Sequence, residues 1–91
     1  MVEVQELYPV VMNLFRQRLD VQVEATDTDL FATGIVDSLM FVELTVQLED
    51  AFGITIPIDK VEFENFRSVA AIADFVLAQS LAQHGKPPRV C

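Results

Sequence analysis

The chain has 91 residues, 52% of them hydrophobic, and a formal net charge of −8. This length allows one domain of three or four helices and leaves little room for an enclosed catalytic cleft. The acidic balance argues against a nucleic-acid partner, which requires clustered lysines and arginines, and suits a partner protein with a basic patch.

The single cysteine, Cys91, is the last residue, so no disulfide can form within the chain. This fits a reducing compartment. The acidic N-terminal stretch lacks the apolar run of a signal peptide, and no segment approaches the roughly 20 apolar residues of a membrane span. We therefore expect a monomeric, cytoplasmic, stand-alone protein that does not bind a membrane.

Apolar residues recur every three or four positions near the N-terminus, which predicts an amphipathic helix over about residues 4–19. Pro9 interrupts this pattern because proline lacks a backbone donor and clashes with the preceding turn. The helix therefore either begins near Glu6 or is kinked at Pro9.

Residues 20–36 form a long predicted loop, and a loop of this length is usually functional or contains local turns. Its Thr-Asp-Thr-Asp sequence favours a turn at residues 29–32. We expect Gly34 to adopt a backbone angle that a side chain would oppose. Four apolar loop residues should reach the core: Leu30, Phe31, Ile35 and Val36.

A second helix is predicted over about residues 38–51, with Asp37 as its N-cap and Gly53 as its C-terminal stop. One stripe of this helix is wholly apolar and should face the core: Phe41, Leu44, Leu48 and Phe52. A neighbouring stripe mixes apolar and acidic residues, which makes a poor core and a good contact surface: Leu39, Glu43, Val46 and Asp50.

The sequence after Gly53 predicts an extended connector over residues 54–58 that buries isoleucines, then a short helix near residues 59–63. Ser68 should cap a last helix, whose apolar positions are Val69, Ile72, Phe75 or Val76, and Leu81. Residues 84–91 contain one glycine and two prolines, and their apolar residues show no clear helical spacing. We therefore divide the chain into a domain at residues 1–83 and a flexible tail at 84–91.

Catalysis by this chain is not expected. Ser38 lacks the glycine-flanked turn of hydrolase nucleophiles, and the only histidine, His84, lies in the predicted tail, so no base is available. The acidic residues from Asp27 onward do not form a calcium loop, because the required sixth-position glycine is Ala32 and the twelfth position is Ser38. We predict no catalytic residues and no metal site.

Ser38 is predicted to lie in the first turn of the second helix, where serine is common. The unpaired N–H groups and the dipole of a helix start also favour an anion such as a phosphate group. The surrounding Gly-Ile-Val-Asp-Ser-Leu at residues 34–39 resembles the phosphopantetheine attachment site of acyl, aminoacyl and peptidyl carrier proteins. The resemblance extends over about residues 7–81.

This resemblance implies a four-helix bundle with three longer helices and one short helix. It implies that a transferase attaches 4′-phosphopantetheine from coenzyme A to Ser38, which follows Asp37, and that the arm carries an acyl or aminoacyl group as a thioester. Such a carrier is not an enzyme; partner enzymes supply the chemistry. The resemblance also implies a partner-binding surface at Leu39, Met40, Glu43, Val46 and Asp50.

Carriers of fatty-acid synthesis usually have an acidic residue where this chain has Met40. The motif and residues 64–68 look more like free-standing carriers of specialised pathways, including D-alanyl and other aminoacyl carriers. The implied partners are a phosphopantetheinyl transferase and an adenylating acyl or aminoacyl ligase, acyltransferase or synthase. The alternative function is an acidic helical adaptor that binds a basic partner and carries no prosthetic group.

Overall fold

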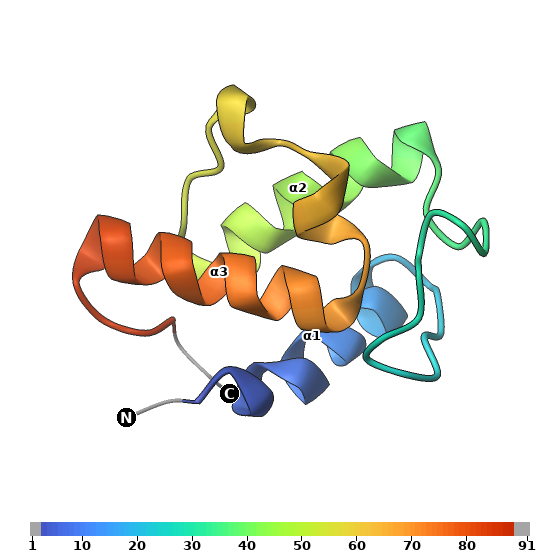
Figure 1. Cartoon of the computed structure of the whole chain (residues 1–91), viewed down its shortest axis with the longest axis horizontal. Helices are drawn as coiled ribbons and strands as arrows, with labels where there is room; N and C mark the ends of the chain where they lie inside the picture. The colour runs from blue at the N-terminus through green and yellow to red at the C-terminus, as the bar shows by residue number, and fades with distance from the viewer. Residues whose placement is uncertain (1–2, 89–91) are drawn as a thin grey trace.

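Three α-helices make up most of the fold: α1 (Val4–Arg18), α2 (Ser38–Phe52) and α3 (Val69–His84). The computed structural model describes residues 3–88, apart from the side chain of Ile58, and shows no β-strand there. α3 packs along α1 and also contacts α2, so it lies between the other elements (Figure 1). Over the same residues, no helix has both the length and the apolar character needed to cross a membrane. The prediction of an all-helical domain is confirmed.

α1 begins at Val4 and continues through Pro9. The predicted range of about residues 4–19 is therefore confirmed, and the alternative start near Glu6 is wrong. Glu3 and Glu6 form a capping box, in which the Glu6 carboxylate accepts a hydrogen bond of 3.0 Å from the Glu3 N–H. This reciprocal pair stabilises the turn that Pro9 weakens. The buried side of the helix follows the predicted spacing: Leu7, Val11, Leu14 and Phe15.

The chain leaves α1 through a left-handed turn at Asp20, whose φ is 56°. The N–H groups of Leu19 and Val21 both donate to the Phe15 carbonyl, at 3.2 and 2.9 Å. This pattern closes the helix end, and glycine is the residue that adopts the left-handed angle most readily. Asp20 therefore holds a strained backbone angle at the start of the long loop.

Replacing Asp20 by glycine should stabilise the domain by about 0.5–1 kcal/mol, because the left-handed angle costs an L-residue energy that glycine does not pay. For a domain of this size the thermal midpoint should rise by about 2–6 °C. Thermal unfolding followed by circular dichroism measures the shift. The same substitution at Asp74, an exposed position inside α3, should lower the midpoint. A lower midpoint for Asp20→Gly would contradict this reading.

The long loop is fastened to the start of α3 by its backbone. Leu30 N–H donates to the Arg67 carbonyl at 2.7 Å, and Ala70 N–H donates to the Thr26 carbonyl at 2.9 Å. Leu30 and Val36 are buried as predicted, whereas Phe31 and Ile35 are half-buried and pack against the core. These contacts give a segment without regular secondary structure a fixed path along one end of the bundle (Figure 1).

The segment between α2 and α3 contains two 3₁₀ turns, η1 (Ile58–Lys60) and η2 (Phe63–Phe66), in place of the short helix expected near residues 59–63. The preceding connector is extended, and it buries Ile54 and Ile56 as predicted. η2 directs the fully buried Phe66 into the core. Short 3₁₀ turns of this kind are common as connectors between longer elements.

α3 buries the predicted residues near its start, but its last turns differ from the prediction. Leu81 is 41% exposed, whereas Ser80 is buried and its hydroxyl donates to the Lys86 carbonyl at 2.8 Å. Gly85, at φ 71°, reverses the chain so that this bond can form. The predicted tail at 84–91 extends beyond the described residues; within them His84 ends α3 and Pro88 is buried.

Candidate functional site

Ser38 is the first residue of α2, and it is exposed. The helix starts there because the Asp37 carboxylate accepts a hydrogen bond of 2.8 Å from the Met40 N–H, and the Asp37 carbonyl accepts one from Phe41. The first N–H groups of a helix have no acceptor inside it, so those of Ser38 and Leu39 remain available at this end. The predicted N-cap and helix start are both confirmed.

The other two serines of the chain are occupied with structural contacts. Ser68 is buried and its Oγ accepts a hydrogen bond of 3.1 Å from the Ala71 N–H, as the N-cap of α3. Ser80 is buried and bonded to the Lys86 carbonyl. Of the three hydroxyls, that of Ser38 belongs to an exposed residue that another enzyme could reach.

The start of α2 also suits a covalently attached phosphodiester. The helix dipole places partial positive charge at this end, and the available N–H groups can donate to phosphate oxygens. The Asp37 carboxylate accepts the capping hydrogen bond from the Met40 N–H. The residues present therefore fit a phosphate group held on the Ser38 oxygen.

The position of this helix start depends on the residues before it. Val36 is buried, and its N–H donates to the Leu30 carbonyl at 2.9 Å. Gly34 has the positive φ, 78°, that was predicted, and this angle lets the chain turn back so that Val36 reaches the core. Asp37 and Ser38 then emerge at the surface directly after a buried anchor.

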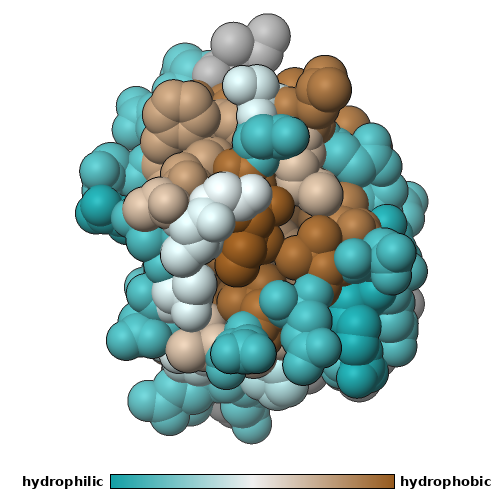
Figure 2. All heavy atoms as spheres, turned by 90° about the vertical axis from the view of Figure 1, so that its right-hand side faces the viewer, coloured by the Kyte–Doolittle hydropathy of each residue, from teal (hydrophilic) through white to brown (hydrophobic). Residues whose placement is uncertain are grey.

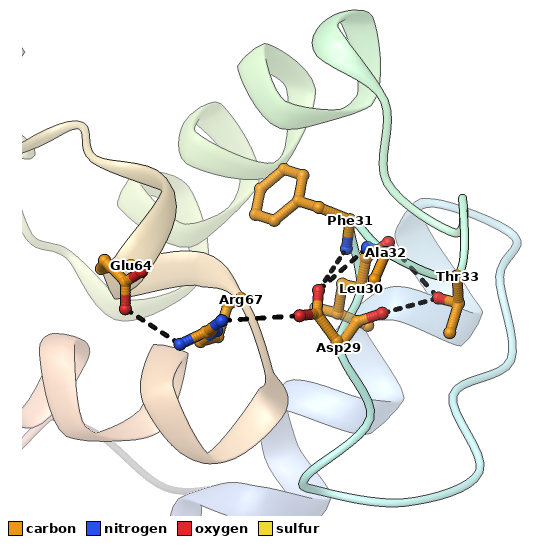
Figure 3. Close-up of polar contacts among 7 residues, drawn as sticks. All are labelled: Asp29, Leu30, Phe31, Ala32, Thr33, Glu64 and Arg67. Atoms are coloured by element: carbon orange, nitrogen blue, oxygen red, sulfur yellow. Dashed lines mark hydrogen bonds and ion pairs between the residues drawn. The ribbon is translucent and has the colours of Figure 1, made fainter.

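Asp29 organises the turn that precedes Gly34 (Figure 3). Its Oδ1 accepts hydrogen bonds from the N–H groups of Phe31 and Ala32 at 3.1 and 2.9 Å, and the Thr33 hydroxyl donates to its carbonyl at 2.7 Å. Its Oδ2 lies 3.7 Å from Arg67 Nη2. The predicted turn at residues 29–32 is confirmed, whereas its tie to Arg67 could not be predicted from local sequence.

These contacts lower the pKa of Asp29 below its usual value. The hydrogen bond from the Ala32 N–H is the largest cause of the lowered pKa. Desolvation comes next and opposes it, and the Phe31 N–H and the Arg67 guanidinium add to the lowering. Each donor stabilises the charged carboxylate. The turn is therefore built around an ionised Asp29.

A lowered pKa makes the stability that Asp29 supplies depend on pH. This contribution should be complete above the unfolded-state pKa of about 3.9 and be lost as pH falls through the lower folded-state value. The difference in thermal midpoint between wild type and Asp29→Asn should therefore be largest at neutral pH and shrink in acid. Asp27→Asn, at an exposed residue of the same loop, is the control. A difference independent of pH would contradict an ionised, stabilising Asp29.

An aromatic cluster packs against the turn at residues 29–32 through the Phe31 ring. The Phe31 ring lies 5.5 Å from Phe41 and 4.9 Å from Phe63, and Phe41 lies 5.1 Å from Phe66, measured between ring centroids. The cluster thus joins the long loop, α2 and η2. Phe63 is 63% exposed although it contacts two of these rings. The sequence analysis gave Phe63 no role at the site.

The outer face of α2 carries an exposed apolar row. Leu39, Val42 and Val46 are 83%, 64% and 50% exposed. Figure 2 faces the end of the bundle where α2 begins and shows apolar surface between hydrophilic margins. The sequence analysis missed Val42, although its spacing of three and four residues from Leu39 and Val46 would have identified it.

The predicted acidic residues of α2 have different surroundings. Glu43 is exposed and accepts a hydrogen bond of 3.1 Å from Gln47, whereas Asp50 pairs with Arg18 of α1 at 2.7 Å. Met40 is half-buried and packs against the core rather than standing free. Of the five predicted partner-binding residues, the structure therefore exposes four on one side of α2: Leu39, Glu43, Val46 and Asp50.

Comparison with known proteins agrees with this geometry. Residues 9–76 match the family described as "Phosphopantetheine attachment site". The chain is also similar to the D-alanyl carrier proteins of Streptococcus pyogenes, for example those of strains Manfredo and NZ131. With each it shares 42% identity over 53 residues, which is 58% of this chain and 67% of the relative. No solved structure gives a significant match.

Proposed function

We propose that Ser38 carries the prosthetic group, since this chain belongs to the phosphopantetheine attachment site family. The chain is a carrier protein that bears 4′-phosphopantetheine on a serine; it is not an enzyme, and partner enzymes such as ligases and transferases act on it. The exposure of Ser38, beside two buried and bonded serines, is the observation that carries the assignment. Ser80 also lies outside the matched residues 9–76.

The neighbours of Ser38 support this role. Asp37 fixes the helix start through its bond to Met40, and the N–H groups of Ser38 and Leu39 can donate to the phosphodiester. The arm supplies a terminal thiol that holds the cargo as a thioester. This chain positions the arm and presents it, and a separate transferase attaches it.

The attachment reaction requires one accessible hydroxyl. The Ser38 oxygen loses its proton and bonds to the phosphorus atom next to the pantetheine of coenzyme A. The phosphoanhydride bond breaks, and adenosine 3′,5′-bisphosphate leaves. Ser38 meets this requirement, because it is the first residue of α2 and is exposed.

The cargo is an acyl or aminoacyl group, and the relatives named D-alanyl carrier proteins favour the aminoacyl class. We propose a phosphopantetheinyl transferase and an adenylating ligase as partners, with an acyltransferase or synthase downstream. In this proposal the protein acts as a cytoplasmic monomer. The carrier domain, predicted over residues 1–83, includes a few more residues at its end, because His84 belongs to α3 and Pro88 is buried. In this proposal η1 and η2 take the place of the short fourth helix of the carrier bundle.

Incubation of the unmodified protein with coenzyme A and a broad-specificity phosphopantetheinyl transferase should add one arm to wild type and none to Ser38→Ala. Intact-mass spectrometry measures the addition. Ser80→Ala is the control, and it should be modified like wild type because its hydroxyl is buried. An unmodified wild type, or a modified Ser38→Ala, would refute the assignment.

The outer face of α2 is the proposed docking surface for these enzymes. We define the docking face as the apolar row Leu39, Val42 and Val46 with its acidic neighbours Glu43 and Asp50, all exposed and on the helix that Ser38 begins. Contact with this row would bring a partner's active site to the Ser38 end. The acidic neighbours suit a partner with lysine or arginine beside its apolar contact residues.

Glu43→Lys should raise the KM of the transferase for this protein about fivefold at low ionic strength and leave kcat unchanged, because it puts a positive charge on the docking face. Steady-state loading assays at two salt concentrations measure the change. Glu24→Lys, in the exposed part of the long loop, alters the net charge equally and should have a smaller effect. Equal effects of the two variants would place docking elsewhere.

A further inference from the structure

The acidic edge of α2 is bound to α1 by a continuous row of side chains. Arg18 Nη1 donates to Asp50 Oδ2 at 2.7 Å and to Gln47 Oε1 at 3.0 Å. Gln47 Nε2 in turn donates to Glu43 Oε1 at 3.1 Å. Arg18 therefore reaches across from the last turn of α1 and meets two residues of α2 that are more than one helical turn from Ser38.

Because of this row, Glu43 and Asp50 differ in how readily each can bind a basic residue of a partner. The Asp50 carboxylate has a guanidinium 2.7 Å away, which offsets its charge toward any approaching base. Within residues 3–88 no lysine or arginine forms an ion pair with Glu43, whose contact is a neutral amide. The uncompensated negative charge thus lies at the end nearer Ser38.

Arg18 also borders the surface beside Ser38. An open hollow of about 680 Å³ lies between the end of α1 and the start of α2, lined by Arg18 and Leu19 from one side and by Asp37, Leu39, Met40, Val42 and Glu43 from the other. A partner side chain entering this hollow would meet apolar residues and the two acids Asp37 and Glu43, with Arg18 opposite them. Arg18 is thus placed to influence docking without touching Ser38.

We propose that Arg18 is a specificity-determining residue of the docking face: by occupying Asp50 it restricts charge recognition to Glu43 and weakens binding of partners that carry several basic residues. This inference rests on the proposed function. It identifies the favoured partner as an enzyme with an apolar contact residue and one base placed for Glu43. Partners with a second base placed for Asp50 must first displace Arg18.

The Arg18–Asp50 ion pair can change the affinity for a partner only modestly. The Arg18 side chain is 42% exposed and that of Asp50 is 72% exposed, and ion pairs this exposed contribute little to stability. The pair can therefore be broken without unfolding the domain, and a partner can compete for Asp50. The expected kinetic effect is a factor of about two to five.

The test compares Arg18→Gln with Arg16→Gln in loading assays with a phosphopantetheinyl transferase. Arg16 is the matched control, because it lies in the same turn of α1, is exposed, and bonds to Asn13 rather than to α2. Arg18→Gln should lower the KM for this protein about two- to fivefold at low salt, with kcat and the thermal midpoint unchanged. Arg16→Gln should change KM less. Arg18→Lys keeps the positive charge but not the guanidinium, so its KM should lie between those of wild type and Arg18→Gln.

Each other outcome has a definite meaning. Equal KM changes in the two glutamine variants would show that net charge alone acts, and would overturn the role of Arg18. A higher KM for Arg18→Gln would overturn it too, since Arg18 would then be a direct contact of the partner. An effect that persists undiminished at high salt would also contradict it. If wild type is not loaded at all, the proposed function fails and this inference falls with it.

Discussion

The hydrogen bond from the Met40 N–H to the Asp37 carboxylate is the interaction on which the proposed attachment site depends. It sets the residue at which α2 begins, and so it makes Ser38 the first helical residue instead of one within the loop. A start one or two residues later would leave the serine in the loop, and an earlier start would place it inside the helix. The exposed hydroxyl and the available N–H groups beside it follow from this single cap.

That cap is supported by a loop whose order comes from contacts with distant parts of the chain. Leu30 and Val36 are buried on either side of the turn, and Asp29 and the Arg67 backbone and side chain tie the turn to the segment before α3. A mobile loop would let the first turn of α2 fray, since helix ends are the least stable part of a helix. The residues that anchor the loop before Ser38, Leu30 and Val36, are therefore also residues of the core.

In our proposal the docking face combines an apolar contact area with selection by charge. The apolar row Leu39, Val42 and Val46 would offer area that is not specific to one partner, whereas the acidic residues would select partners by charge. Arg18 donates hydrogen bonds to Asp50 and Gln47, and we propose that it thereby limits the charge that a partner meets. In a chain with net charge −8, a single arginine facing α2 has more influence on local recognition than its share of the composition suggests.

The sequence by itself determined the three α-helices, the N-caps Asp37 and Ser68, the turn at Asp29, and the position of Ser38, because helical periodicity, capping and turn chemistry are local properties. Tertiary structure decided what depends on neighbours distant in sequence. It replaced the short helix by η1 and η2, buried Ser80 in place of Leu81, and packed Met40 against the core. It also brought Arg18 to Asp50, 32 residues away in the chain. No local pattern encodes that pairing, because it arises from the way α1 and α2 are placed by the common core.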